Sequence, residues 1–386
     1  MMPLLQCETR WPTVRSRAIA RQVAHFVKGE RMNNYPGEPA AQAGLDLESL
    51  SAYLGAALEG GVRGELSASL ISGGRSNPTY RITDAEQAWV LRRPPYGHIL
   101  PSAHNMKREF TVIKSLADTP VPVPETVLMC EDEKVIGAPF YIMELVDGRP
   151  VGTVEQATAI TPEARYQLGI DLADTLAELH SLNPAAVGLG SFGRPTGYLE
   201  RQLNRWALQW EASQVEERPE VSALLDKLRR AMPTSHFPGI IHGDVKLDNV
   251  LVAPDDPGNI AAVLDWEMAA VGDTLADVGI MLSFWDQTGE VDNPLTRGLA
   301  RLDGFPTRVE LLDRYAVRRG ITLPDIDWYV IFADVKVAVI LEGIAIRHTK
   351  GHTVGEGFDD IADMVGPLLE RALDFAAAST VSELRR

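Results

Sequence analysis

The chain has 386 residues, of which 45% are hydrophobic and 23% charged, as is usual for a globular protein with a sizeable core. Its net charge of −16 disfavours nucleic acid and anionic membranes as partners, because an acidic surface repels phosphate. The two cysteines, Cys7 and Cys130, form no CxxC pair and are typical of a reducing compartment. No apolar run approaches the ~20 residues that cross a bilayer. We therefore expect a cytoplasmic protein with no nucleic-acid, membrane or obligatory protein partner.

The first segment, residues 1–44, differs from the rest because it is rich in arginine and poor in acidic side chains. Such a composition is compatible with an organellar presequence, with an extension upstream of a start at Met32, or with a loosely ordered extension. The third interpretation is the simplest, and the segment is treated apart from the fold. "NNYPGEPAAQAG" at its end is typical of a linker.

Residues 45–147 alternate helix and strand patterns. Helical spacing of apolar residues predicts helices over 45–58 and 104–118. Short runs rich in β-branched and aromatic residues predict five strands, over 65–71, 78–83, 88–93, 125–132 and 138–146. A glycine-rich turn, "SGGRSN", separates the first two strands. We expect a small, strand-rich domain here.

Residues 148–386 are mainly helical in pattern, with the clearest helices over 161–182, 196–213, 220–232, 327–348 and 357–378. A polar cluster interrupts them in the middle. It comprises His242, Asp244, Lys246, Asp248 and Asn249, and it lies between two short apolar runs, 239–241 and 250–252. We expect these runs to be buried strands of one hairpin, because an ordinary solvated turn needs far fewer polar residues.

The spacing His242-x-Asp244-x₄-Asn249 is followed sixteen residues later by Asp265, which ends another apolar run. Phosphoryl transfer needs a carboxylate to orient a hydroxyl, and oxygen ligands to hold Mg²⁺ against phosphates. A metal-dependent hydrolase that uses His242, Asp244 and Asp265 is an alternative. It is disfavoured because a single imidazole suits a zinc site poorly.

The same residue order resembles the catalytic loop and metal-binding aspartate of protein kinases. "HGD" with "LDWEMAAVGDTLADVG" resembles the aminoglycoside phosphotransferase-like (choline kinase-type) small-molecule kinases more closely. Within that group the chain is most similar to the phosphotransferase domain found fused to acyl-CoA dehydrogenases. The resemblance runs from about residue 45 to the C-terminus, through "ISGGRSNPTYRI", "WVLRRPP", "LPSAHNMKREF", "VPVP", "IGAPFYIMELVDGR", "HGDVKLDN" and "VLDWEMAAVGDTLADVG".

This resemblance implies an α+β, protein-kinase-like fold with two lobes. The N-lobe, residues 45–147, would be a small antiparallel sheet with one helix that binds nucleotide. The C-lobe, residues 148–386, would be mainly helical and would carry the catalytic loop and the substrate pocket.

The resemblance also assigns roles in the polar cluster. Asp244 would be the catalytic base, and His242 would brace the loop. Lys246 would contact the transferred phosphate, and Asn249 and Asp265 would be the Mg²⁺ ligands. Asp248 carries no such role and is interpreted as a solvated turn residue.

For ATP, the resemblance places the phosphates under the turn formed by Gly73, Gly74, Arg75, Ser76 and Asn77. Arg92 stands where protein kinases have a strand lysine, and Glu109 would be its ion-pair partner. Glu144 and Val146 would meet adenine through their backbone groups. Asp277 would brace the catalytic loop.

Other polar and aromatic residues have plainer interpretations. Asp273 is expected to cap the helix that begins near Thr274, and His180 to be a packing residue. Three aromatic residues, Tyr198, Trp206 and Trp210, are expected in the core. Glu342 and Arg347 could line an acceptor pocket or lie on the surface, and both possibilities stay open.

The resulting hypothesis is an ATP- and Mg²⁺-dependent enzyme that phosphorylates a hydroxyl of a small molecule. The acceptor could be a hydroxyacyl compound or aminoglycoside-like. The alternative is a nucleotide-binding pseudokinase or sensor with little turnover, which the arginine at position 92 and the unusual glycine turn would allow.

Overall fold

The structure is a computed structural model that describes residues 45–71, 77–95, 105–214, 216–350 and 358–386. The segment 1–44, and with it every interpretation of the N-terminus, lies outside the described residues. So do Gly73, Gly74, Arg75 and Ser76 of the glycine-rich turn.

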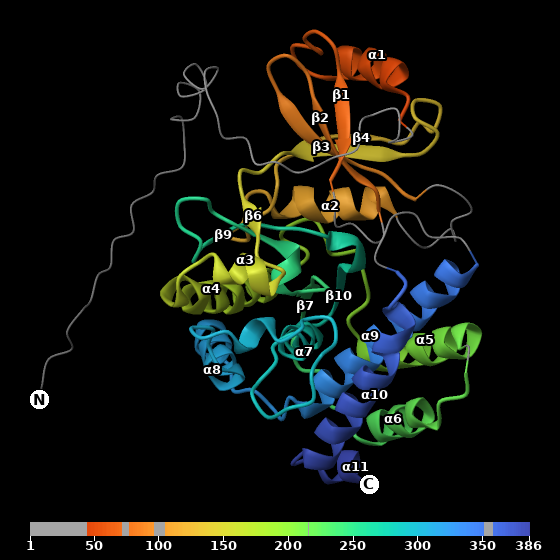
Figure 1. The fold of residues 1–386 in the computed structure, drawn as a ribbon, viewed down its shortest axis with the longest axis vertical. Helices are drawn as coiled ribbons and strands as arrows, with labels where there is room; N and C mark the ends of the chain where they lie inside the picture. Colours follow the sequence, from red (N-terminus) through yellow and green to blue (C-terminus); the bar gives the residue numbers. More distant parts are fainter. Residues whose placement is uncertain (1–44, 72–76, 96–104, 215, 351–357) are drawn as a thin grey trace, which may run out of the picture. The chain divides into compact units, whose positions relative to one another are not determined.

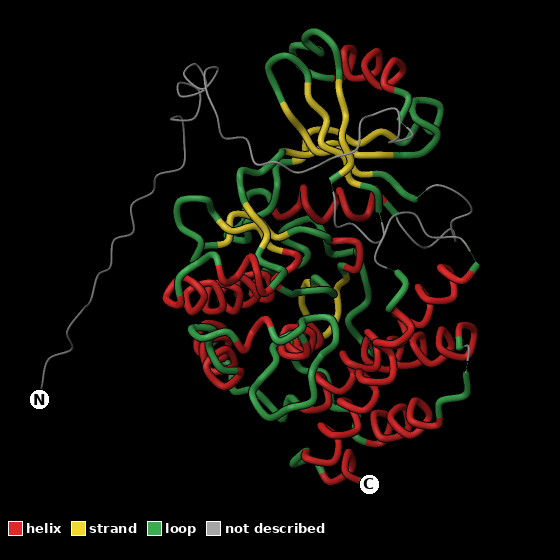
Figure 2. The backbone as a smooth tube through the Cα atoms, viewed as in Figure 1, coloured by secondary structure: helices red, strands yellow, loops and turns green. Residues whose placement is uncertain are grey.

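The first part of the described chain is a five-stranded antiparallel sheet (Figures 1 and 2). Its strands are β1 (Ser67–Leu70), β2 (Thr79–Thr83), β3 (Ala88–Arg92), β4 (Thr126–Cys130) and β5 (Phe140–Glu144), in the order β1-β2-β3-β5-β4. Two helices accompany it, α1 (Leu47–Ala57) and α2 (Met106–Leu116). All seven elements lie within the ranges that the sequence predicts.

The sheet is buried on both faces, and the period-2 alternation of a strand explains how. In β5, Phe140 and Ile142 belong to a core that contains Leu50 and Leu54 of α1. The alternate residues Tyr141 and Met143 belong to a second core, together with Val112 and Leu116 of α2. Figure 1 shows α2 between the sheet and the helices that follow.

Two small sheets come next, and they correct the expected hairpin. The strand before the polar cluster, β7 (Pro238–Ile241), pairs with β10 (Ala270–Asp273). The strand after the cluster, β8 (Val250–Val252), pairs with β9 (Ile260–Val263) and with β6 (Arg149–Pro150). The two apolar runs are therefore strands, but of different sheets. The prediction of one hairpin is wrong because an apolar run does not specify its partner.

Helices make up most of the remaining chain (Figure 2). The longest of the described helices is α9 (Asp327–Thr349), which is apolar on nearly every side and packs against α5, α7 and α10. The others are α3 (Val154–Thr158), α4 (Pro162–Ser181), α5 (Tyr198–Ser213), α6 (Pro219–Arg230), α7 (Leu275–Ser283), α8 (Arg308–Arg319), α10 (Ile361–Ala378) and α11 (Ser382–Arg385), with 3₁₀ turns η3 (Leu247–Asn249), η4 (Trp266–Met268) and η5 (Leu299–Arg301). Across the described ranges, none of the helices combines the length and apolar character that crossing a bilayer requires.

The second core is continuous between the sheet and the helical part. It contains Val90 and Met143 of the sheet as well as Leu172 of α4 and Val278 of α7. Arg108 of α2 adds a polar link, because its guanidinium stacks on the Phe192 ring at 3.8 Å and donates to the Phe192 carbonyl at 3.3 Å. The α+β, protein-kinase-like fold is as predicted.

Candidate active site

The loop between β7 and β8, residues 242–249, is held from below by Asp277 of α7. The carboxylate of Asp277 accepts from the backbone N–H of His242 at 2.6 Å and of Gly243 at 2.7 Å. Asp277 is fully buried, and its Oδ2 also lies 3.2 Å from Nε2 of His180. The bracing contact expected of Asp277 is thus confirmed.

Both ring nitrogens of His242 make hydrogen bonds. Nδ1 accepts from the backbone N–H of Asp244 at 3.1 Å, and Nε2 donates to the Leu264 carbonyl at 2.8 Å. The ring packs against Trp266, with 4.5 Å between centroids, and the residue is 1% exposed. Both ring nitrogens are therefore occupied by the backbone, which fits a bracing residue and disfavours a zinc ligand or a proton shuttle.

Asp244, Lys246 and Asn249 form the polar centre of the loop. The amide nitrogen of Asn249 donates to Asp244 twice, to its carbonyl at 2.7 Å and to Oδ2 at 2.8 Å. Lys246 Nζ lies 3.0 Å from the same Oδ2. Burial raises the pKa of Asp244, but the charges of Lys246 and Lys336 more than offset it, so that the net pKa lies below the usual value. Asp244 is therefore ionised at neutral pH.

Strand register brings the two expected magnesium ligands together. Val250 of β8 pairs with Val263 of β9, and the Leu264 N–H donates to the Asn249 carbonyl at 2.8 Å. Asn249 lies directly before β8, and Asp265 lies just after the paired strand β9. Both residues are therefore at the same end of this strand pair. Asp265 has a left-handed backbone, with φ 63°, which is uncommon for a residue other than glycine and occurs most often at functional sites.

Arg92, at the end of β3, joins three carboxylates. Its Nη2 donates to Asp265 Oδ1 at 2.6 Å and lies 3.8 Å from Glu267 Oε2. Its Nε donates to Glu109 Oε2 of α2 at 3.2 Å. Burial raises the pKa of Glu109, which is 1% exposed, and Arg92 opposes that rise. The structure brings Arg92 and Glu109 together, as the resemblance implies.

The other residues predicted to bind nucleotide differ in their burial and in their partners. Asn77, the last residue of the expected phosphate turn, is buried, and its amide donates to Glu267 Oε2 at 2.7 Å. Glu144 is exposed at the end of β5, where its N–H donates to the Glu125 carbonyl at 2.8 Å. Its carboxylate accepts from the Glu125 N–H at 3.1 Å. Val146 is half-buried just beyond that strand.

Most residues given plainer interpretations lie as expected, but Tyr198 is less buried than a core residue would be. Asp273 accepts from the N–H of Leu275 in the first turn of α7 at 3.0 Å. His180 is buried, and its Nδ1 lies 2.8 Å from the Tyr315 hydroxyl. Asp248 is exposed. The indoles of Trp206 and Trp210 are buried and Tyr198 is half-buried, while Glu342 is buried and Arg347 exposed.

The sequence interpretation missed Glu267, which bonds Asn77, and Lys336 of α9. Lys336 Nζ donates to the Gly243 carbonyl at 2.5 Å, and the residue is 7% exposed. A signal was present, because a lysine inside a helix that is apolar all round must be paired to be buried. The sequence could not show which group it meets.

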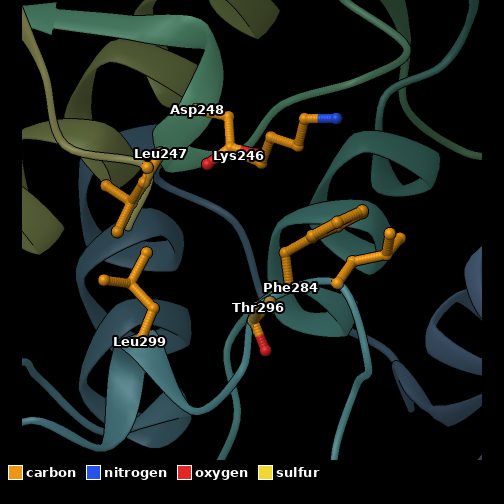
Figure 3. Close-up of a pocket in the computed structure, with 8 residues that line it drawn as sticks. Lys246, Leu247, Asp248, Phe284, Thr296 and Leu299 are labelled. Carbon is orange, nitrogen blue, oxygen red and sulfur yellow. The ribbon is translucent and has the colours of Figure 1, made fainter. Parts of the chain in front are cut away.

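A small cavity lies beside the loop, on the side of Lys246 (Figure 3). Its volume is about 10 Å³, room for at most one water molecule. Lys246 Nζ lies 5.1 Å from the centroid of the Phe284 ring. The lining residues are Gly152, Lys246, Leu247, Asp248, Phe284, Leu295, Thr296 and Leu299.

No group of three or more histidine, cysteine or acidic side chains with metal-binding geometry occurs among the described residues. A magnesium ion needs no group of that size, because it usually takes one or two protein oxygens and completes its shell with phosphates and water. Because Asn249 Nδ2 is used on Asp244, Oδ1 is the amide atom left for a cation. Asn249 and Asp265 together therefore fit a magnesium ion held jointly with a nucleotide.

Known proteins are similar to this chain in sequence and in fold. The pattern that describes the phosphotransferase enzyme family matches residues 67–312. Acyl-CoA dehydrogenase family member 11 from Rattus norvegicus is 35% identical over 349 residues, which cover 88% of this chain and 44% of that protein. The chain thus spans less than half the length of this relative.

Solved structures agree. A Ralstonia eutropha protein that is classed with the aminoglycoside phosphotransferases has a TM-score of 0.72 and 32% identity, and the match covers 87% of this chain and 99% of that one. An aminoglycoside phosphotransferase in complex with ADP and hygromycin B has a TM-score of 0.56 and 15% identity, over 85% and 97% of the two chains, and shows the fold alone. The chain belongs to the phosphotransferase enzyme family.

Proposed function

We propose that the chain transfers the γ-phosphoryl group of ATP to a hydroxyl of a small molecule, with Mg²⁺. One observation carries the proposal. Asp244 is bonded to Asn249 and Lys246, and the adjacent Asp265 is bonded to the Arg92–Glu109 pair. These are the groups that positioning and charge neutralisation in phosphoryl transfer require.

Asp244 would orient the acceptor hydroxyl and take its proton. Its low pKa makes it a weak base, which suits a reaction in which positioning matters more than proton abstraction. Lys246 would neutralise charge on the transferred phosphate, while His242 and Asp277 keep the loop in place. The proton would pass from the hydroxyl to Asp244 as the phosphoryl group moves from ATP to the hydroxyl oxygen.

Arg92 would bind the phosphates of ATP, and Glu109 would hold its guanidinium in place. Asp265 would contact both Arg92 and the metal ion. The turn of Gly73, Gly74, Arg75, Ser76 and Asn77 stays the predicted cover for the phosphates. Because the N–H of Glu144 is used on Glu125, its carbonyl and the backbone of Val146 are the groups left for adenine. Mg²⁺, held by Asn249 and Asp265, would neutralise charge on the β- and γ-phosphates.

The similarity to an acyl-CoA dehydrogenase family member favours a hydroxyacyl acceptor over an aminoglycoside-like one. The charges near Asp244 do not separate the two classes, because Lys246 and Lys336 are both opposed by carboxylates.

We further propose that nucleotide binds to the lobe of residues 45–147 and acceptor to that of residues 148–386. We expect the chain to work in the cytoplasm without an obligatory protein partner.

The test combines binding with a product search. ATP–Mg²⁺ should bind the purified chain, and mass spectrometry should find a metabolite in a cell extract that gains a phosphoryl group. A panel of hydroxyacyl-CoA thioesters and aminoglycosides then separates the two acceptor classes. The proposed phosphotransferase activity would be refuted if the chain did not bind ATP–Mg²⁺, or if Asp244→Ala left turnover undiminished. Binding with slow hydrolysis that no acceptor accelerates would favour the pseudokinase.

A further inference from the structure

The peptide group between Gly243 and Asp244 is tied at both of its polar atoms. Its N–H, which belongs to Asp244, donates to His242 Nδ1 at 3.1 Å. Its carbonyl, which belongs to Gly243, accepts from Lys336 Nζ at 2.5 Å. The orientation of this peptide sets where the Asp244 side chain leaves the backbone, because Asp244 follows it directly.

Gly243 has a backbone conformation that glycine adopts readily and other residues rarely do. Its φ is +89°, and a Cβ built there would lie 2.5 Å from the Met268 carbonyl oxygen. Two helices bind its polar backbone groups. Asp277 of α7 accepts from the Gly243 N–H at 2.7 Å, and Lys336 of α9 donates to its carbonyl.

A carbonyl oxygen does not require a cation as its partner, so the choice of a buried lysine needs a further reason. Burying an ammonium group costs free energy unless opposite charge compensates it. The carboxylates of Asp244 and Asp277 supply that charge, and the Trp206 ring centroid lies 5.8 Å from Nζ. Burial lowers the pKa of Lys336 to about 8, with the two carboxylates opposing the shift.

The charges that face Lys336 from neighbouring elements are of both signs. Asp244 and Asp277 favour its protonated form, whereas Arg205 of α5 and Lys246 of the loop disfavour it. Lys336 in turn favours the ionised form of Asp244. The lysine and the aspartate therefore stabilise each other's charge, at a place where the lysine also holds the backbone.

We propose that Lys336 is a positioning residue for phosphoryl transfer, which fixes the Gly243–Asp244 peptide from α9 and so aims the Asp244 carboxylate at the acceptor. The inference rests on the proposed function. Lys336 acts through Gly243 and Asp244 and does not touch ATP, because Arg92, Asn249 and Asp265 form the proposed nucleotide and metal contacts.

The experiment compares Lys336→Met, which keeps the length and loses donor and charge, with Lys336→Gln, which keeps a donor. Val339→Ala, at a buried apolar position about one turn further along the same helix, is the matched control for lost packing. Hydrogen exchange of the peptide covering residues 240–249 reports on the loop. Hydrolysis of ATP–Mg²⁺, with water as acceptor, reports turnover, and titration with ADP–Mg²⁺ reports nucleotide affinity.

In Lys336→Met we expect faster exchange in 240–249 and a turnover lower by about 10- to 100-fold, since small misplacements of a catalytic group cost that much. The Kd for ADP–Mg²⁺ should change by less than about twofold, because the nucleotide contacts stay in place. Lys336→Gln should recover part of the loss and serves alone if the methionine variant does not fold. Val339→Ala should keep wild-type exchange in 240–249 and wild-type turnover.

Unchanged exchange in 240–249, unchanged turnover, or an equal loss in Val339→Ala would overturn the proposal. A fall in nucleotide affinity as large as the fall in turnover would also overturn it. If the wild-type chain itself neither binds nor hydrolyses ATP–Mg²⁺, the proposed function fails, and the exchange comparison still decides whether Lys336 holds the loop.

Discussion

Arg92 and Asp265, which are 173 residues apart in sequence, form a hydrogen-bonded ion pair at 2.6 Å between the sheet and the segment after β9. The same guanidinium is bonded to Glu109 of α2. One side chain thus connects the helix next to the sheet with a proposed magnesium ligand.

Replacing Arg92 should weaken nucleotide binding. We expect Arg92→Met to raise the Kd for ATP–Mg²⁺ about 10-fold or more, because a charge-assisted hydrogen bond contributes about 1.5–3 kcal/mol. Arg92→Lys should lose less affinity for ATP–Mg²⁺, because it keeps the positive charge. It should still bind more weakly than wild type, because an ammonium group cannot bridge Glu109 and Asp265 with a planar fork. Arg63→Met, at an exposed pair with Glu86, is the control and should bind as wild type does. Equal affinity in all four proteins would contradict the assigned role, and titration calorimetry measures it.

Removing the Asp277 carboxylate should destabilise the chain and slow turnover. Asp277→Ala leaves the N–H groups of His242 and Gly243 buried without an acceptor, which should lower the free energy of unfolding by about 3 kcal/mol. Asp277→Asn retains one acceptor oxygen and should lose about half as much. Chemical denaturation gives both values. Asp255→Asn, at an exposed position beyond the loop, should leave stability within about 0.5 kcal/mol of wild type.

Adding a methyl group to Gly243 tests the tight contact with Met268. Both Gly243 and Gly60 have a φ of +89°, but a Cβ on Gly60 meets nothing within 4 Å, whereas one on Gly243 lies 2.5 Å from a carbonyl oxygen. Gly60→Ala should therefore lose only about 1–2 kcal/mol, from the left-handed backbone. Gly243→Ala should lower the free energy of unfolding by clearly more than that, as thermal or denaturant unfolding would measure. A loss no larger than that of Gly60→Ala would show that the loop can move aside.

Stability should fall with acidification through the titration of His180. Burial lowers the pKa of His180, and Asp277 opposes this only in part, so the unfolded chain binds the proton more readily than the folded one. The free energy of unfolding should therefore rise with pH between the folded and unfolded pKa values of this group. It should decline as the pH drops below about 6.5, the unfolded value. His180→Gln should flatten this part of the profile, as denaturant melts at pH 5 to 8 would show. An unchanged slope would assign the titration to another group.

The parts of the site that lie close together in sequence were predictable from it. His242, Asp244 and Asn249 fall within one loop, and the structure shows the hydrogen bonds that join them. Asp265 was also predictable, because it ends an apolar run that proves to be β9. The Arg92–Glu109 pair followed from the family resemblance, since nothing in the local pattern joins a strand residue to a helix residue.

Two features depended on tertiary pairing and could not be predicted. The apolar runs around the loop belong to different sheets, because β7 pairs with β10 and β8 pairs with β9. Both partner strands lie later in the sequence. Lys336 lies 93 residues from Gly243, and only the packing of α9 under the loop brings them together. Patterns of periodicity identify elements, whereas the choice of partner depends on contacts that no local window contains.

The alternation of side chains along β3 and β5 has a consequence for evolution and engineering. One face of the sheet, with Val90 and Met143, is part of the same apolar core as the helices around the loop of residues 242–249. A fragment cut after residue 147 would expose that face to water, so we expect it to aggregate and not to fold as a portable nucleotide-binding module. Swapping sheets between relatives should succeed only when α2 and the residues it covers are exchanged together.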